Sequence, residues 1–131
     1  MSDSCKVTFQ PEGKSVFVLA GTSNYSPASS SCTGYSANGF EAVYSIDVPA
    51  GQSVDITYDA GTDNALYVVT ACPDYDATTC VVGADDNFSA PYQESVTLTN
   101  SGGSTATYYV VADNFSTGAC SDYTLTFSAF Y

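Results

Sequence analysis

The stretch from Ala65 to Asn87, "ALYVVTACPDYDATTCVVGADDN", combines the two kinds of side chain with which this protein could do chemistry, thiols and clustered carboxylates. Cys72 and Cys80 are separated by seven residues. A redox pair or a thiolate metal site needs a lowered thiol pKa, which nearby cations provide. The intervening "PDYDATT" brings two carboxylates and no cation. We therefore interpret Cys72–Cys80 as a structural disulfide, whose loop of about nine residues gains roughly 2 to 3 kcal/mol in the chain-entropy model.

The charge balance excludes several function classes. Fourteen acids face only two lysines, so the formal net charge is −12, and histidine is absent. Such a charge repels nucleic acid and anionic membrane surfaces. The absence of histidine excludes a Ser-His-Asp triad, a Cys-His dyad and a histidine-ligated zinc site. Paired carboxylates could in principle hydrolyse glycosides, but among so many acids a suitably spaced pair arises by chance. We expect a protein that is not an enzyme.

The elements that must position these residues read as strands. Short segments rich in Val, Ile, Thr, Tyr and Phe alternate with Gly, Pro, Asn, Asp and Ser clusters, and no stretch has a helical period. The turn sequences "PAGQ" and "NSGGS" favour antiparallel neighbours. The 131 residues are enough for one domain with one core. The pattern predicts an all-β fold, an antiparallel two-sheet sandwich of jelly-roll type with about nine strands, stapled by disulfides.

In such a sandwich successive connections fall at opposite ends, which we call poles. One pole should receive the turns 49–52, 72–78 and 100–104. The other, the acidic pole, should receive the long loop 22–40 and the connections 59–63, 84–93 and 113–120. Its acids are Glu41, Asp59, Asp63, Asp85, Asp86, Glu94, Asp113 and Asp122.

Calcium takes six to eight oxygen ligands, which clustered carboxylates and backbone carbonyls supply. We expect Asp85 and Asp86 of "GADDN" to lie beside Asp63, with Asp113 completing a calcium site. The alternative is that these acids are solvated loop residues that keep the protein soluble. The sequence leaves both interpretations open.

The three remaining cysteines, Cys5, Cys32 and Cys120, all map to the acidic pole, so any pair of them is geometrically permitted. We favour Cys32–Cys120, because that bond would fix the long loop against the start of the last strand, with Cys5 as the free thiol. Among the loop aromatics, Tyr35 and Tyr92 are candidate ligand contacts, since exposed aromatics are enriched in recognition surfaces. The alternative is that loop aromatics cover the ends of the core.

Several phrases, in this order and spacing, resemble the bacterial pre-peptidase C-terminal domain family. They are "EAVYSIDVPAGQSVDITY", "GTDNALYVV", "ESVTLTN", "TATYYVVADN" and "SDYTLTFS", and the resemblance covers about residues 14–128. The cysteines are not part of the general family pattern. The cysteine-bearing form is similar to repeats of large secreted proteins of myxobacterium-like organisms. The resemblance implies a β-sandwich accessory module, and some collagenase-type relatives are adhesive and bind calcium.

These observations together predict a secreted or cell-surface bacterial module that spans residues 1–131 as one domain. Five cysteines favour an oxidising compartment, and the start "MSDSCKVTFQ" lacks a signal peptide, so we expect a mature segment of a larger parent. Its expected role is non-catalytic attachment, targeting or secretion of that parent. Expected partners are neighbouring domains and an extracellular protein or polysaccharide, with no nucleic acid and no membrane insertion. The alternatives are a carbohydrate-binding module and a structural repeat unit without a ligand.

Overall fold

The computed structural model describes residues 7–10, 17–18, 32–33, 42–61, 63–71, 77–87, 89, 92–114 and 123–131. Its strands are β1 (Val7–Gln10), β2 (Phe17–Val18), β3 (Ala42–Val48), β4 (Ser53–Ala60), β5 (Asn64–Val69), β6 (Cys80–Ala84), β7 (Tyr92–Thr99), β8 (Ala106–Asn114) and β9 (Tyr123–Phe127). The described residues contain no helix. From Ala42 onward the strands overlap the segments rich in Val, Ile, Thr, Tyr and Phe, and β5, β7 and β8 extend one or two residues beyond them.

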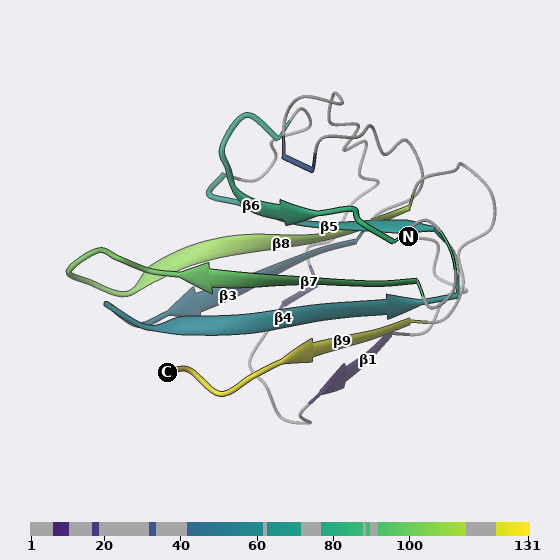
Figure 1. The fold of residues 1–131 in the computed structure, drawn as a ribbon. Coiled ribbons are helices and arrows are strands. Elements are labelled where there is room, and N and C mark those ends of the chain that lie inside the picture. The colour runs from purple at the N-terminus through teal and green to yellow at the C-terminus, as the bar shows by residue number, and fades with distance from the viewer. Residues whose placement is uncertain are drawn as a thin grey trace.

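The strands form two sheets packed face to face, as Figure 1 shows. The four-stranded sheet has the order β1-β9-β4-β7, and the five-stranded sheet has the order β2-β3-β8-β5-β6. All strand pairs are antiparallel except β1 with β9, which is parallel. The all-β, two-sheet prediction is therefore confirmed, while the expectation of purely antiparallel sheets is wrong at this one pair. This exception joins the first and the last strand of the described part of the chain.

The main core lies between the sheets. Alternate residues of β4 point inward, so this strand buries Val54, Ile56 and Tyr58 and leaves Asp55 and Asp59 exposed. The five-stranded sheet also buries part of its other face, in a smaller cluster of Val43, Ala65, Tyr67, Val69, Ala77 and Val111. We call this second surface the outer cluster. Because β5 is covered on both faces, all six of its residues are buried.

Three tyrosines connect the two sheets through the core. Tyr44 of β3 and Tyr123 of β9 share a hydrogen bond between their hydroxyl groups, across the space between the sheets. The ring of Tyr58 packs edge-on against Tyr123, with centroids 5.2 Å apart. Burial, together with the neighbouring tyrosine hydroxyls, raises the pKa of Tyr44 far above its ordinary range. These phenols therefore stay neutral and serve as polar links inside an apolar core.

The strand registers confirm the poles of the described turns, whereas Cys32, expected at the acidic pole, is bonded to Cys80 at the end of β6 away from that pole. Val48 pairs with Ala106 and Ser53 with Thr99 at one end, while Ala60 pairs with Tyr92 and Asn64 with Asn114 at the other. The connections after β4, β6 and β8 therefore share the acidic pole. A hydrogen bond from Asn64 Nδ2 to the carbonyl of Tyr92, 3.1 Å long, joins the two sheets there.

At the opposite pole a buried asparagine joins two turns. Asn100 Nδ2 donates to the carbonyls of Val48 (2.9 Å) and Ser104 (2.8 Å), and its Oδ1 accepts from the amide of Gly102 (3.0 Å). Its backbone carbonyl accepts from Gly51, whose φ of 73° is the left-handed conformation that glycine tolerates. Asn100 is 3% exposed, so this network holds the 49–52 and 100–104 turns together inside the protein.

Candidate functional site

The hairpin of β5 and β6 carries the acids of the candidate site, and a bulge sets its geometry. Val68 pairs with Val82, but the next residue, Val69, pairs with Cys80, so Val81 is an extra residue in β6. A bulge of this kind reverses the face on which the following side chains lie. Val82 therefore packs against the main core, whereas Cys80 lies on the face of the outer cluster, with Val69. The extra Val81 is 43% exposed.

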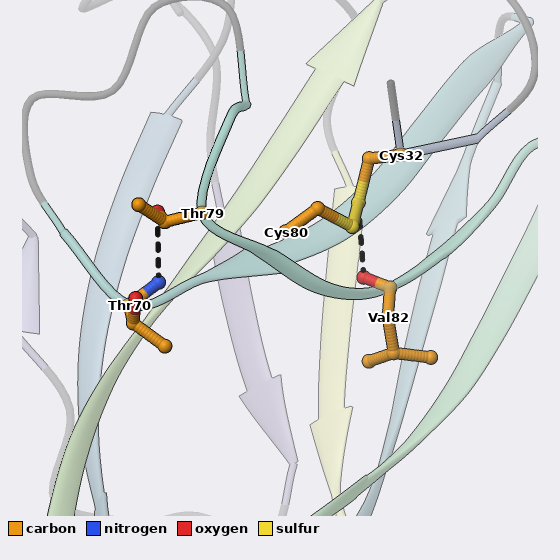
Figure 2. Close-up of a disulfide and its surroundings, with 5 residues drawn as sticks. All are labelled: Cys32, Thr70, Thr79, Cys80 and Val82. Atoms are coloured by element: carbon orange, nitrogen blue, oxygen red, sulfur yellow. Dashed lines mark hydrogen bonds between the residues drawn. A yellow bond between two sulfur atoms is a disulfide. The ribbon is translucent and has the colours of Figure 1, made fainter. Parts of the chain in front are cut away.

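The bulge explains the disulfide, which the sequence-based pairing got wrong. The structure joins Cys32 to Cys80 (Figure 2). The expected bonds Cys72–Cys80 and Cys32–Cys120 are therefore both wrong. Cys32 belongs to the long loop, and it packs against the outer cluster, on the face to which the bulge turns Cys80. The bond therefore ties Cys32 to the outer face of the five-stranded sheet. Cys5, Cys72 and Cys120 lie outside the described residues.

The disulfide lies close against the backbone of β6. Gly83 lies under Cys32, and a Cβ at that position would be 2.8 Å from the carbonyl oxygen of Cys32 and 2.9 Å from its Sγ. Cys32 Sγ also lies 3.4 Å from the carbonyl oxygen of Val82. Below the bond, the amide of Thr70 donates to the Thr79 carbonyl at 3.2 Å, which closes the neck of the hairpin (Figure 2). The hairpin is therefore held at its neck and on its outer face.

At the far end of β6 the chain delivers Asp85 and Asp86 to the acidic pole. Together with Asp63, which precedes β5, and Glu94 of β7, they form what we call the acid cluster. Asp85 is 4% exposed and Glu94 is 1% exposed, so two of the four carboxyl groups are removed from water. Glu94 is inward-facing, like Val96 and Leu98 further along β7. The cluster therefore lies at the mouth of the main core.

Backbone amides hold one carboxylate of the cluster in place. The amides of Asp86 and Asn87 both donate to Glu94 Oε1, at 2.9 and 2.7 Å. Hydrogen bonds to an ionised acceptor are stronger than neutral ones. This contact bends the chain after β6 around the side chain of Glu94, and it places Asp85 beside it. From the sequence, Glu94 could be assigned only to the acidic pole, because its inward direction depends on the register of β7.

Asp85 and Asp63 lie where a negative charge is disfavoured. Burial, and to a lesser extent the charges of Asp63, Glu94 and Asp86, raise the pKa of Asp85 to about 6. Burial also raises the pKa of Asp63, against a lowering hydrogen bond from the Asn64 backbone. Asp63 Oδ1 is buried and has no hydrogen-bond partner among the described residues. A buried acceptor without a donor is costly, so this oxygen would gain from a cation or a donor.

Asp113 is not brought to this cluster. It follows Ala112, which faces the main core, so its side chain lies on the opposite face of β8, with Val111 of the outer cluster. There it accepts a 2.8 Å hydrogen bond from the hydroxyl of Tyr67, and it is fully buried. The structure thus groups Asp63, Asp85 and Asp86 from the predicted calcium set and adds Glu94, with Asp113 on the far side of the sheet.

Of the two candidate ligand aromatics, Tyr35 and Tyr92, only Tyr92 lies within the described residues. Tyr92 begins β7 on the inward-facing side of the strand, opposite Ala60, and is half-buried. It therefore covers the end of the core at the acidic pole. Tyr35 lies outside the described residues.

No three Asp, Glu or Cys side chains within the described residues are gathered closely enough to form a ready-made metal site. The chemistry of the cluster still suits a hard cation, because all its donors are carboxylate oxygens and one of them is an orphan. Calcium binding therefore stays a prediction.

Comparison with known proteins finds no match. No protein-family model, no curated protein and no solved structure matches the chain. The resemblance to the pre-peptidase C-terminal domain family thus depends on the quoted phrases alone. A membrane-spanning helix is not found in the part of the chain that the structure describes.

Proposed function

We propose that the protein is a secreted, non-catalytic accessory module of the pre-peptidase C-terminal type, which binds calcium at its acidic pole and serves to attach or target a larger parent protein. The fold would then be a nine-stranded jelly roll. The proposal draws on the order of the family-like phrases and on the two-sheet architecture. Its central support is the acid cluster, where burial and mutual repulsion leave Asp85 with a raised pKa and Asp63 with an orphan oxygen.

Calcium would relieve both features at once. A divalent cation compensates the like charges around Asp85, and it supplies the partner that Asp63 Oδ1 lacks. In this proposal Asp63, Asp85 and Asp86 hold the ion, with water completing its coordination. Glu94 acts differently, because two backbone amides already occupy its Oε1 and fix the chain that carries Asp85 and Asp86. Its role would be to position the ligands.

The disulfide supports the proposed location outside the cell. Disulfides persist in oxidising compartments and are rare in the cytosol. Cys32–Cys80 joins residues 48 positions apart, so it restricts a long stretch of the unfolded chain. This is how a small domain in an extracellular setting resists unfolding.

Calcium titration by calorimetry and thermal melting tests the proposal. We expect heat of binding and a rise in melting temperature in calcium, because an ion that binds only the folded state stabilises it. Any salt screens a protein of charge −12, so sodium chloride at equal ionic strength is the necessary control. Equal effects of calcium and matched sodium chloride would refute calcium binding.

Matched variants locate the site. Asp63→Asn and Asp85→Asn should each abolish the calcium-specific rise, while Asp59→Asn should not. Asp59 is exposed on the outer face of β4, so its replacement changes the net charge by the same amount away from the cluster. A calcium response that all three variants retain would assign the ion to another place. A response lost only in Asp59→Asn would contradict the proposed ligands.

A further inference from the structure

Among the described residues, the long edge strand β7 lacks the features that protect the other sheet edges. β7 forms one edge of the four-stranded sheet, and its pairing within the described part of the chain is with β4, in unbroken register from Tyr92 to Thr99. Natural edge strands are usually short, bulged or marked by lysine or proline, which prevents pairing with another chain. β1 has four residues, β2 has two, and β6 carries the bulge. The eight residues of β7 contain no lysine, proline or bulge.

The hydrogen-bonding direction of β7 follows from its neighbours. The amide of Asn100 donates to the carbonyl of Gln52, so Asn100 and every second residue before it face β4. The backbone groups of Gln93, Ser95, Thr97 and Thr99 must then point away from the sheet. The Gln93 carbonyl accepts from Asn87 Nδ2. No backbone partner of Ser95, Thr97 or Thr99 occurs among the described residues, so these three residues offer their amides and carbonyls at the open edge.

The charges along this edge point to a second copy of the same chain. A protein of charge −12 repels itself, and its self-contacts must avoid acids. The exposed side chains of β7 are Gln93, Ser95, Thr97 and Thr99, all of them uncharged. The only acid of the strand, Glu94, is buried and bonded to backbone amides. Along β7 itself, two acidic molecules can therefore meet without negative side chains facing each other.

We propose that β7 pairs with β7 of a second copy, antiparallel about a two-fold axis at Val96, and so joins the two four-stranded sheets into one. In that register Ser95 of each copy lies opposite Thr97 of the other, and their outward backbone groups pair in both directions. The antiparallel arrangement sets the acid cluster of one copy beside the 100–105 turn of the other. That turn, "NSGGST", carries no charge. A parallel arrangement would bring the two acid clusters together.

Charge pairs at the edge test this geometry. In Ser95→Lys/Thr97→Lys, two lysines face two lysines across the axis, and in Ser95→Glu/Thr97→Glu, four glutamates meet in the same way. We expect sedimentation to show wild-type dimers forming between about 10 µM and 1 mM, and each charged variant to weaken self-association by about tenfold or more. The two variants mixed should form a heterodimer, because every cross-strand pair then joins lysine to glutamate.

Two controls separate this effect from others. The lysine variant changes the net charge from −12 to −10 and the glutamate variant to −14, so a loss shared by both does not follow net charge. Both variants also lose the side-chain hydrogen bonds Thr57–Ser95 and Thr97–Asp55. Ser95→Ala/Thr97→Val loses the same two bonds without adding charge, and it should dimerise like the wild type.

Three results would overturn the proposal. The first is a wild type that stays monomeric up to about 1 mM, a concentration that would reveal even weak pairing. The second is a dimer that both charged variants form as readily as the wild type. The third is capture of an unrelated extended peptide by β7 without self-association, which would assign the edge to a different partner. Melting of each variant confirms that it is folded before the comparison is made.

Discussion

The disulfide gives the sharpest quantitative prediction. In the chain-entropy model, a cross-link restricts the unfolded chain more when it closes a longer loop. Cys32–Cys80 spans 48 positions, which corresponds to roughly 4 kcal/mol. The pair expected from sequence, Cys72–Cys80, would close a loop of about nine residues and contribute only about 2.6 kcal/mol. The two pairings of Cys80 therefore predict different losses of stability in Cys80→Ser, about 4 kcal/mol and about 2.6 kcal/mol.

We expect Cys32→Ser and Cys80→Ser each to lower the free energy of unfolding by about 4 kcal/mol, because either substitution removes the same bond. For a domain of this size, about 3 to 5 °C of melting temperature is lost per kcal/mol, so Cys32→Ser should melt about 12 to 20 °C lower. Urea denaturation under non-reducing conditions measures the first quantity. Calorimetry measures the second.

Peptide mapping without reduction supplies the control, because it identifies the bonded cysteines directly. It should recover a peptide pair that joins Cys32 to Cys80. A wild type whose mapping joins Cys72 to Cys80, together with a change below about 1 kcal/mol in Cys32→Ser, would refute the reasoning from the bulge.

Three further predictions follow from the packing, the turns and the acid cluster. Gly83→Ala should lower the free energy of unfolding by about 1 to 3 kcal/mol in urea denaturation, because its Cβ would meet the backbone of Cys32 at 2.8 Å; a neutral result would contradict the close approach. Asn100→Ala should lower it by about 2 to 4 kcal/mol, since three side-chain hydrogen bonds of a buried residue are lost, and unchanged melting would show that the network is dispensable. The pKa of Asp85 is raised in the folded protein from 3.8 to about 6, so the folded state binds the proton more tightly than the unfolded state. Its contribution to stability is then present below pH 4 and is lost as pH rises through about 6. Asp85→Asn should remove this fall in the free energy of unfolding with rising pH, as measured by urea denaturation at several pH values, whereas Asp59→Asn should keep it. The same pH dependence in wild type and Asp85→Asn would refute the assignment to Asp85.

The strands and poles could be predicted because they depend on local patterns. The alternation of Tyr44, Ile46 and Val48, or of Tyr123, Leu125 and Phe127, marks strands that bury one face. Once the strands are ordered along the chain, antiparallel pairing puts Asp63 and Asp85 at one end without any knowledge of which strands are neighbours. The register of β5 with β6 and β8 bears this out.

The disulfide could not be predicted in this way, because it depends on one extra residue. Without a bulge, Cys80 would lie on the same face as Val82, toward the main core. The bulge at Val81 turns it to the other face, and only there does Cys32 reach it. Gly83 is the one trace of this arrangement in the sequence, since a glycine within a strand often marks a bulge or a close approach of backbone.

The separation of Asp113 from the other acids was likewise hidden. Pole assignment gives the end of the sandwich at which a residue lies but does not give the face of its sheet. Ala112 faces the main core, so its neighbour Asp113 must face the outer cluster and Tyr67. The role of Asn100 could not be predicted for a different reason. The sequence "NSGGS" is typical of an exposed turn, and the burial of Asn100 depends on its contact with Val48.

The parallel pairing of β1 with β9 determines how the protein would respond to a pulling force. Val7 lies opposite Tyr123 and Gln10 opposite Thr126, so the first strand and the last run in the same direction side by side. Tension applied at the two ends of the chain would slide these strands past each other. All the hydrogen bonds between them would bear the load together, in shear. Tension carried through the chain would therefore meet a contact whose hydrogen bonds resist it together.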